Sequence, residues 1–422
     1  MLSIRKGLAL VLAATLLVLV GCSGTKTDEK KVVTPEAPKP AVKITIWHGM
    51  GADSAHGKVA TQLIKEFNDS QKEVIVEEVY QGSYSDLETK LTAAIAAQTP
   101  PTIAQNNDTM LTNLVKAKAV QPLDSLVPAA EKADYPPALL AATTFDGKLY
   151  ALPFNKSAVV LIYDKTLVPN PPKDWDEFHK VAKQVTVPGQ IYGTAFPADI
   201  YYFGQHLAGN GNGWLTADGK AAFNSPEGVA ALQFIVDMAK DGSAIQLKPK
   251  EYQSSYFNEG RAAMIATTSA SFAYIIPANK HPWGVAPLYA GPKGAGVPLS
   301  GANVSIMNGI KPEETQAAAK FILWLTGKEA TLKWAMGKTG YGPVRISATK
   351  DPRWTEFTKA NPEYQVLADA LVNGKIQVND PNWGKVQKEI TTAVESALLG
   401  KTTAKQALDE AAAKANDILG KK

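Results

Sequence analysis

Apolar residues recur along this chain with two different spacings. In some short segments every second residue is apolar, as in a β-strand with one buried face. In longer segments the spacing is three or four residues, as in an amphipathic helix. Between residues 43 and 118 the two patterns take turns, with strands expected at 43–47, 74–80 and 102–105 and helices at 54–68, 84–98 and 108–118. Ser54 suits the N-cap of the first helix. This β-α-β-α-β order predicts a doubly wound, largely parallel sheet.

The same alternation returns further along the chain. Strands are expected at 158–163, 192–196 and 262–267, and helices at 175–185, 226–240 and 252–260. Helical spacing then continues to the C-terminus, at 312–326, 328–336, 364–372, 383–399 and 403–419. Two α/β series and a helical tail predict an α/β protein of two lobes, each a mostly parallel sheet flanked by helices. Loops rich in Gly, Asn and Pro are candidate cleft edges or hinges, at 209–219 and 289–301.

The N-terminus has a pattern of its own. Arg5 and Lys6 precede an apolar run at 7–20, which is shorter than the roughly 20 residues that a membrane-spanning helix needs. A basic start and a short apolar run are typical of a signal peptide, expected here at 1–21. The run ends in LVGC at 19–22, which resembles a bacterial lipobox and implies that Cys22 receives diacylglycerol and becomes the first residue after cleavage. The alternative is a buried cysteine beside an ordinary cleavage site.

The segment after the cleavage site predicts a tether. Residues 23–41 contain no aromatic side chain and are rich in Lys, Thr and Pro. Such a composition cannot bury enough apolar area to fold, and its prolines favour an extended chain. Cys22 is the only cysteine, so no disulfide can form within the chain. We therefore expect a lipid-anchored protein with a disordered tether at 22–41, held at the extracytoplasmic face of the cell membrane (the periplasmic side if an outer membrane exists).

The net charge and the motifs of the chain limit the classes of function that it can have. The formal net charge is +4, and loss of the two basic residues in 1–21 leaves +2, so nucleic acid is not an expected partner. The five histidines show no HExxH spacing, and neither the phosphate loop GxxxxGK[ST] nor the nucleophile motif GxSxG is present. No catalytic residue, metal site or cofactor is therefore expected, and a binding protein is favoured over an enzyme.

Several motifs follow one another in a fixed order. They are KITIWH at 43–48, LPFN at 152–155, LIYDK at 161–165, FNEGRAAM at 257–264, and a helix pair at 317–334 followed by TGYGPV at 339–344. Together they resemble the carbohydrate-binding branch of the extracellular solute-binding proteins of ABC importers, over about residues 42–419. The resemblance implies a two-lobed periplasmic-binding-protein fold with a ligand cleft between the lobes, a monomer, and ABC permease subunits as partners. The implied lobes are 42–153 with 302–345, and 154–301 with 346–422.

Three further motifs are similar to the members of that family that bind glycerol-3-phosphate, namely WHGM at 47–50, YxGxY at 80–84 and KTGY at 338–341. This resemblance implies ligand contacts at Tyr84, Asp108, Ser157 or its neighbour, Ser269 or Ser271, Gly301 and Tyr341. Where those members have an arginine for the phosphate, this chain reads KIQVN at 375–379, and Gln377 carries no charge. A neutral saccharide or polyol is therefore expected as much as a glycerol phosphate.

Strand ends and aromatic residues supply the remaining candidates. Ligands of parallel sheets lie beyond the carboxyl ends of the strands, where the pattern puts Trp47, His48 and Asp108. Sugars also need aromatic surfaces for their C–H faces, which Tyr201 and Trp383 add. Each candidate has a structural alternative. Trp47 and Tyr201 suit a core equally well, and Asp108 suits a helix cap.

We therefore expect the substrate-binding lipoprotein of an ABC importer. It would capture a saccharide or a glycerol-phosphate-type polyol by hinge closure and deliver it to the membrane permease. One alternative is a secreted glycoside-acting enzyme, which needs two carboxylates facing each other across the cleft. Another is a ligand-binding partner of a chemoreceptor, which binds its ligand without transport.

Overall fold

The structure is a computed structural model that describes residues 40–275, 281–374, 378, 380 and 382–420. The described residues from 41 onward form one compact unit. The expected signal peptide at 1–21, Cys22 and the tether as far as residue 39 lie outside the described residues, as do Lys375 and Gln377. In the described part of the chain, no helix is long and apolar enough to cross a membrane.

The first lobe is built on three parallel strands in the order β2-β1-β3. Strands and helices alternate as predicted: β1 (Val42–His48), α1 (Ala55–Ser70), β2 (Val74–Tyr80), α2 (Tyr84–Ala96), β3 (Ile103–Asn106) and α3 (Asp108–Lys116). The apolar residues of the strands are buried, among them Ile44 and Ile46 of β1. Ser54 caps α1 as predicted, because its side chain accepts a hydrogen bond from the Gly57 amide.

The second lobe repeats this plan with three parallel strands in the order β9-β7-β8. Its elements are α6 (Trp175–Val185), β7 (Tyr192–Pro197), α7 (Ile200–Gly209), α8 (Pro226–Lys240), β8 (Ala244–Leu247), α9 (Gln253–Asn258) and β9 (Ala262–Thr268). Helices α6 and α8 have the predicted bounds, because the side chains of Asp174 and Ser225 cap their first turns. The two-lobed α/β architecture with parallel sheets is therefore confirmed.

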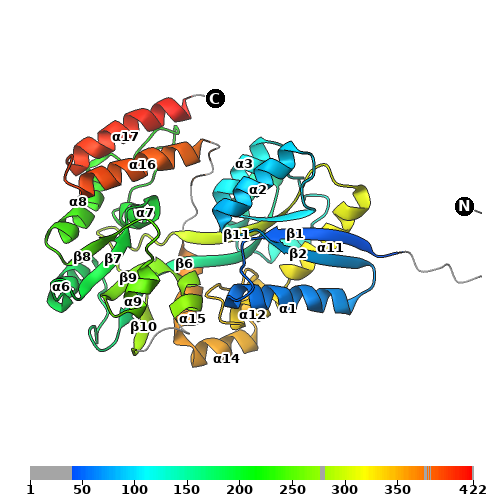
Figure 1. Ribbon diagram of the computed structural model, residues 1–422, viewed down its shortest axis with the longest axis horizontal. Coiled ribbons are helices and arrows are strands. Elements are labelled where there is room, and N and C mark those ends of the chain that lie inside the picture. Colours follow the sequence, from blue (N-terminus) through cyan, green and yellow to red (C-terminus); the bar gives the residue numbers. More distant parts are fainter. Residues whose placement is uncertain (1–39, 276–280, 375–377, 379, 381, 421–422) are drawn as a thin grey trace, which may run out of the picture. The chain divides into compact units, whose positions relative to one another are not determined.

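Two antiparallel strands link the lobes (Figure 1). The first part of β6 (Leu152–Asp164) pairs with β11 (Leu299–Ile306), and its second part pairs with β9 and with β10 (Trp283–Ala286). Strand β11 also pairs with β3, so one sheet runs through both lobes. Strand β11 was not predicted, and its residues 299–301 were wrongly assigned to the loop at 289–301. The segment Ser300 to Asn303 consists of small and polar residues that carry no alternating apolar pattern.

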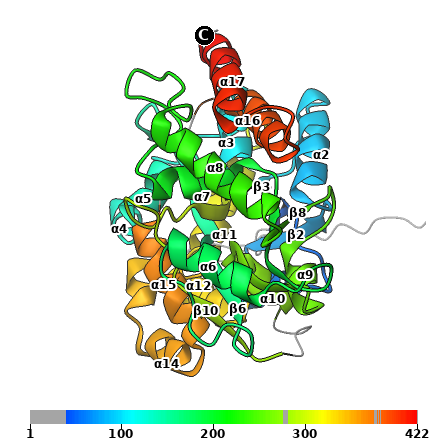
Figure 2. The same cartoon turned by 90° about the vertical axis from the view of Figure 1, so that its left-hand side faces the viewer.

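The C-terminal helices cover both lobes. Helices α11 (Pro312–Leu325) and α12 (Lys328–Met336) pack on α1, and α11 also contacts β1. Helix α15 (Pro362–Asn373) packs on β6 and β10, while α16 (Trp383–Leu398) and α17 (Ala404–Leu419) pair with each other over α7 and α8 (Figure 2). The shortest elements were not predicted, since they hold too few residues for a periodic pattern: α4 (Ala129–Ala133), α5 (Pro137–Ala141), β4 (Thr144–Phe145), β5 (Lys148–Leu149), η1 (Ser269–Ser271), α10 (Phe272–Ile275) and α13 (Ile346–Thr349). Helix α14 (Pro352–Ala360) was also not predicted.

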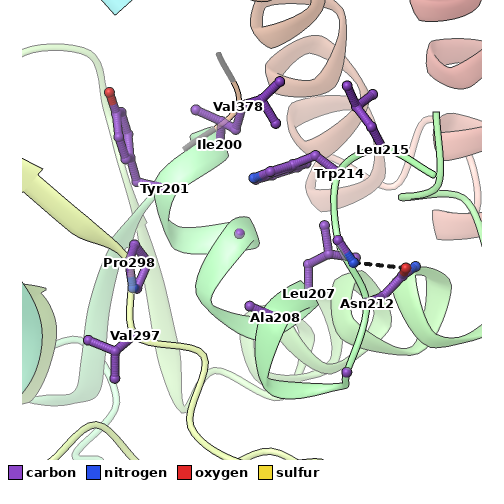
Figure 3. A pocket seen from close by; sticks show the side chains of 13 residues that line it. Ile200, Tyr201, Leu207, Ala208, Asn212, Trp214, Leu215, Val297, Pro298 and Val378 are labelled. Carbon is purple, nitrogen blue, oxygen red and sulfur yellow. Dashed lines mark hydrogen bonds between the residues drawn. The ribbon is translucent and has the colours of Figure 1, made fainter. Parts of the chain in front are cut away.

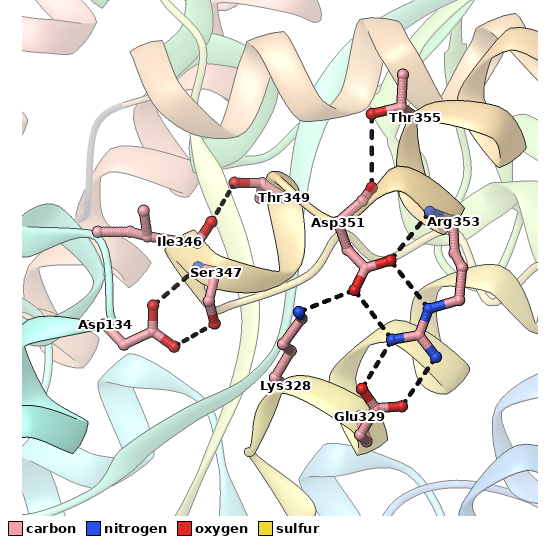
Figure 4. A network of polar contacts seen from close by, with 9 residues as sticks. All are labelled: Asp134, Lys328, Glu329, Ile346, Ser347, Thr349, Asp351, Arg353 and Thr355. Atoms are coloured by element: carbon pink, nitrogen blue, oxygen red, sulfur yellow. Dashed lines mark hydrogen bonds and ion pairs between the residues drawn. The ribbon is translucent and has the colours of Figure 1, made fainter.

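A polar network ties the start of α14 to the first turn of α12 (Figure 4). Asp351, the N-cap of α14, accepts hydrogen bonds from the backbone and the guanidinium of Arg353 and pairs with Lys328 at 2.9 Å. Arg353 also donates two hydrogen bonds to Glu329, at 2.9 and 2.7 Å. The Arg353 guanidinium and the Lys328 ammonium hold the pKa of Asp351 well below its usual range.

Candidate ligand-binding cleft

A cavity of about 740 Å³ lies between the two lobes and over the strands that link them. The first lobe contributes Tyr84, Asn107 and His56, and the loop before α13 contributes Tyr341. The linking strands contribute Asn155, Ser157 and Gly301. The second lobe contributes Asp199, Tyr201, Tyr252, Gln253 and Tyr274. A volume of this size lies within the range of about 300–1,000 Å³ that is typical of small-molecule sites.

A chain of buried amides fixes the wall on the side of the first lobe. The Gly49 amide, just after β1, donates to Gln105 Oε1 at 2.9 Å. Gln105 Nε2 donates to Asn155 Oδ1 at 3.2 Å, and Asn155 Nδ2 lies 3.5 Å from the Tyr84 hydroxyl. The carboxyl ends of β1 and β3 are thereby joined to the linking strand β6. The wall is preorganised, because each of these side chains is held by the next one.

Neutral ring groups complete this wall. Burial raises the pKa of Tyr84 to about 12 and raises that of Tyr341 well above its usual value. Burial also lowers the pKa of His56, whose Nε2 donates to the Thr339 carbonyl at 2.7 Å and whose ring lies 5.2 Å from that of Tyr341. Both phenols and the imidazole are therefore uncharged at neutral pH, and they offer hydrogen bonds without a net charge.

One carboxylate lies on the opposite wall. Asp199 caps α7, and its Oδ1 accepts a hydrogen bond from the Tyr202 amide at 2.8 Å. Burial raises the pKa of Asp199 to about 6. Among the described residues that line the cavity, Asp199 is the only Asp or Glu, and none is Lys or Arg. Among all described residues, no group of three or more His, Cys, Asp or Glu side chains could hold a metal ion.

Exposed aromatic rings stand at the rim of the cavity. Tyr201 is 45% exposed, Tyr274 is 54% exposed and Tyr252 is 67% exposed. Three exposed rings around one cavity offer apolar faces to a ligand. These rings belong to three different elements or loops of the second lobe.

A second, smaller cavity of about 460 Å³ shares lining residues with the first, and Figure 3 shows the side chains that line it. We call it the apolar slot, and its walls come from Ile200, Leu207, Trp214, Leu215 and Val297 together with Tyr201 and Pro298. Tyr201 and Pro298 line both cavities. The slot is thus an extension of the main cavity along the surface of the second lobe.

Comparison with known proteins assigns the family. Residues 62–365 match the family of bacterial extracellular solute-binding proteins. This chain belongs to that family. The family resemblance that the sequence motifs predicted is therefore confirmed.

Individual relatives match this solute-binding protein along nearly their whole length. The sn-glycerol-3-phosphate-binding periplasmic protein UgpB of Brucella melitensis biotype 1 is 26% identical over 431 residues, covering 92% of this chain and 98% of that protein. The structure of UgpB from Mycobacterium tuberculosis in complex with glycerophosphocholine has a TM-score of 0.81 at 22% identity, covering 90% of this chain and 99% of that one. The GacH receptor of Streptomyces glaucescens GLA.O, solved unliganded and with acarbose, has a TM-score of 0.81 at 20% identity, with the same coverage. The two structural matches establish the fold.

Five of the predicted contact residues line the cavity of this solute-binding protein: Tyr84, Ser157, Tyr201, Gly301 and Tyr341. Ser157 is buried, and its Oγ accepts a hydrogen bond from Thr268 Oγ1 at 2.8 Å. Gly301 has a φ of +109°, and a Cβ there would lie 1.9 Å from the Asn155 carbonyl oxygen. Only glycine fits this position, where β11 passes close to the backbone of β6.

Asp108 is not a lining residue. Its Oδ1 lies 2.9 Å from Lys156 Nζ and 2.8 Å from Asn303 Nδ2, so the carboxylate is engaged inside the protein. The alternative that Asp108 caps α3 is wrong, because Asn107 is the N-cap and accepts a hydrogen bond from the Met110 amide at 2.8 Å. Asn107, one position earlier, lines the cavity.

The end of β1 also points away from the cavity. Trp47 packs on the apolar cluster beneath α2, so the structure favours the core alternative for this residue. His48 is 2% exposed, with Nδ1 accepting from the Met50 amide and Nε2 3.4 Å from Glu78 Oε2. The strand end therefore positions Gly49 and Met50 at the wall in place of its aromatic residues.

Three further predicted ligand contacts make contacts inside the protein and do not line the cavity. Ser269 donates to the Gly340 carbonyl at 2.7 Å, and Ser271 Oγ lies 3.3 Å from Thr267 Oγ1. In their place the preceding residues Thr267 and Thr268 line the cavity. Trp383 is 1% exposed, because it packs edge-on against Trp214 at 5.7 Å between ring centroids.

Sequence reasoning missed several lining residues. Asn155 is part of the LPFN motif, but nothing in the motif says that its amide bridges Gln105 and Tyr84. Gln253 Nε2 donates to the Ala195 and Ala266 carbonyls, both at 2.9 Å, which ties α9 to β7 and β9. Asp199 was detectable as a helix cap, since it directly precedes the helical segment that holds Tyr201.

Proposed function

We propose that this protein is the substrate-binding component of an ABC importer. It captures a saccharide or a glycerol-phosphate-type polyol in the cavity between its lobes and hands it to the membrane permease. The relatives named above support this proposal, since their names describe binding of glycerol-3-phosphate, glycerophosphocholine and acarbose.

The composition of the cavity wall carries the proposal. Neutral hydroxyls and amides from Tyr84, Tyr341 and Asn155 stand opposite exposed aromatic rings such as Tyr252 and Tyr274. Hydroxyls and amides pair with the hydroxyl groups of a polyol, and aromatic faces cover its C–H groups. This combination suits reversible binding of a polyhydroxylated molecule.

The linking strands supply the hinge for capture. Ligand binds one wall first, and a rotation about β6 and β11 then brings the other wall into contact and expels water. The ligand favours the closed form only by its extra affinity for that form. The proposal assigns 42–153 with 302–345 to the first lobe and 154–301 with 346–422 to the second, in a monomeric protein.

The proposal includes a lipid anchor. A diacylglycerol on Cys22 and the tether at 22–41 keep the cleft near the permease, which raises its effective concentration there. The proposed lipid anchor also implies a signal peptide at 1–21 and attachment to the extracytoplasmic face of the membrane. Mass spectrometry of the protein from membranes should find the lipid on Cys22, and Cys22→Ser should move the protein into the soluble fraction.

An enzymatic role is not favoured. Glycoside hydrolysis needs two carboxyl groups about 5–10 Å apart across the scissile bond. Asp199 is the only carboxylate among the described lining residues. The UgpB relative is named as a glycerol-3-phosphate-binding protein. An uptake experiment distinguishes a chemoreceptor role from a transport role, because a chemoreceptor partner binds its ligand without uptake.

Uptake by cells tests the proposal. A strain that lacks this protein should lose uptake of the ligand, and the wild-type gene should restore it. A chemoreceptor partner would leave uptake intact. An enzyme would release a product when the purified protein is incubated with glycosides, and either of these results would overturn the proposal.

A further inference from the structure

Two glycines flank the cavity residue Tyr341, in the loop that connects α12 to α13. We call residues 339–342 the Tyr341 loop. Gly340 has a φ of +74°, in the left-handed region that residues with a Cβ rarely adopt. Because glycine allows many backbone conformations, the sequence of the loop does not by itself fix the direction of the Tyr341 side chain. Contacts from other parts of the chain have to fix it.

Tyr364 and Ser269 hold the backbone of Gly340 from both sides of its peptide unit. The buried Tyr364 hydroxyl, in the first turn of α15, accepts a hydrogen bond from the Gly340 amide at 3.2 Å. Ser269 Oγ, just after β9, donates to the Gly340 carbonyl at 2.7 Å. A Cβ on Gly340 would lie 2.1 Å from the Ser269 carbonyl oxygen. The residue before Tyr341 is therefore held through its amide and its carbonyl at a place that only glycine fits.

The ring of Tyr364 is itself held in place. It packs edge-on against Phe272 of α10 at 5.6 Å and against Phe357 of α14 at 5.0 Å between ring centroids. A ring that is packed on two sides keeps its hydroxyl at one position. Tyr364 is not among the described residues that line the cavity, so any effect of its hydroxyl on a ligand has to pass through another residue.

The neighbouring residues of the Tyr341 loop are held by the first lobe and by a linking strand. His56 Nε2 donates to the Thr339 carbonyl at 2.7 Å, and its ring lies 5.2 Å from that of Tyr341. The Gly342 amide donates to the Lys156 carbonyl of β6 at 3.0 Å. Tyr341 thus lies in a short loop whose residues on either side are fixed by hydrogen bonds.

We infer that Tyr364 is a positioning residue for ligand binding, because its hydroxyl holds Gly340 and thereby keeps the Tyr341 hydroxyl at the cavity wall. Ser269 acts in the same way through the Gly340 carbonyl. This inference rests on the proposed function and deepens it, since both residues affect the ligand without touching it. For Ser269 it replaces the ligand contact that the family motifs predicted.

A double-mutant cycle tests the inference. Tyr364→Phe removes only the hydroxyl and leaves the Gly340 amide without its acceptor. Calorimetry measures the affinity of wild type, Tyr364→Phe, Tyr341→Phe and the double variant. The probes are glycerol-3-phosphate, glycerophosphocholine, maltose and acarbose, and the cycle uses the probe that wild type binds most tightly. Tyr364→Phe should weaken binding about fivefold in wild type and less than about twofold in Tyr341→Phe, because its effect passes through the Tyr341 hydroxyl.

Tyr135→Phe is the matched control. Tyr135 is also buried, its hydroxyl lies 2.7 Å from Thr326 Oγ1, and it is not among the described residues that line the cavity. Tyr135→Phe and Tyr364→Phe should both lower the melting temperature, since each loses a buried hydrogen bond. Only Tyr364→Phe should also lose affinity. Ser269→Ala, which removes the donor to the Gly340 carbonyl, should show the same dependence on Tyr341 as Tyr364→Phe.

The outcomes separate the inference from the proposed function. Equal losses of affinity from Tyr364→Phe in wild type and in Tyr341→Phe would overturn the inference, as would unchanged affinity in a folded Tyr364→Phe. In both cases the binding of a probe by wild type leaves the proposed function standing. If none of the four probes binds wild type, the proposed function fails and the inference fails with it.

Discussion

Lys156 and Asp108 form a buried ion pair beneath the cavity, with 2.9 Å between Nζ and Oδ1. Lys156 comes from the linking strand β6, and Asp108 from the first turn of α3. Asn303 of β11 donates to the same Asp108 oxygen at 2.8 Å. The pair therefore joins both linking strands to the first lobe, and it neutralises a lysine that would otherwise present a positive charge near the ligand.

Removing one partner of this pair should destabilise the protein. Asp108→Ala leaves the Lys156 ammonium buried without its counter-ion, which should lower the free energy of unfolding by about 3–5 kcal/mol. Urea unfolding followed by tryptophan fluorescence measures it. The double variant Asp108→Ala with Lys156→Met should recover most of the loss. A double variant as unstable as the single one would mean that packing, and not the unpaired charge, caused the loss.

Tyr341→Phe should weaken ligand binding and leave the fold intact. The substitution keeps the ring that packs on His56 at 5.2 Å and removes only a neutral hydroxyl at the cavity wall. One lost hydrogen bond of about 0.5–1.5 kcal/mol corresponds to roughly a 2- to 13-fold loss of affinity. Calorimetry measures it, with Tyr150→Phe as the control because Tyr150 lies outside the cavity lining. Equal affinity in both variants would remove the Tyr341 hydroxyl from the site.

Asp199→Asn should change the pH dependence of stability. Burial raises the pKa of Asp199 from 3.8 to about 6, so the folded protein holds the proton more tightly than the unfolded chain does. The stabilisation by this group is complete below pH 3.8 and is lost as the pH rises through 6, a change of up to about 3 kcal/mol. Asparagine keeps the helix cap without the charge. Relative to wild type, the variant should gain stability between pH 4 and pH 7 in thermal melts, and parallel profiles would contradict the assignment.

The same variant reports the charge of the ligand. An uncharged glycoside should bind Asp199→Asn equally well or more weakly, because no repulsion is relieved. An anionic ligand should bind it more tightly. Calorimetry at pH 7.5, where the wild-type carboxyl is ionised, shows whether the substitution raises or lowers the affinity for the ligand. A gain in affinity for the physiological ligand would show that it carries a negative charge.

His206 should make the second lobe sensitive to acid. Its Nδ1 lies 2.8 Å from the Tyr202 carbonyl and its Nε2 lies 3.2 Å from the Tyr289 hydroxyl, and burial lowers its pKa from 6.5 to about 4. As the pH falls, His206 therefore takes up a proton in the unfolded chain before it does so in the folded protein. The stabilisation is complete above pH 6.5 and is lost as the pH falls through 4, by up to about 3 kcal/mol. In thermal melts, His206→Gln should lose less stability than wild type over this range. Identical losses would exclude His206 as the cause.

Gly301→Ala should strain the linking strands. A Cβ at Gly301 would lie 1.9 Å from the Asn155 carbonyl oxygen, in addition to the cost of a φ of +109°. We expect a loss of at least about 3 kcal/mol in the free energy of unfolding. Gly309→Ala is the control, since its φ is +82° with nothing within 4 Å, and it should cost only about 1–2 kcal/mol. Equal losses in urea unfolding would mean that the backbone angle alone matters.

Much of the fold could be predicted because local patterns are strong. Helices α6, α8 and α12 have the predicted bounds, and capping side chains mark the starts of α6 and α8. Strand β11 was missed, because Gly301 and its neighbours are placed there by pairing with β6 and not by their own preference.

The site was harder to predict because its geometry depends on contacts between distant residues. Tyr84, Gly301 and Tyr341 came from family motifs and line the cavity. The position of Asn155 depends on Gln105, which lies 50 residues away in the sequence. Aromatic residues such as Trp383 satisfy a core and a sugar site equally well, so burial alone decides between them.

A thermal-shift titration of the purified protein tests the central claim most directly. The account predicts that a saccharide or a glycerol-phosphate-type polyol raises the melting temperature in a concentration-dependent way. A hundredfold excess over its dissociation constant should stabilise the protein by about 2.7 kcal/mol. A melting temperature that responds to no saccharide, polyol or glycerol phosphate in the panel would contradict it.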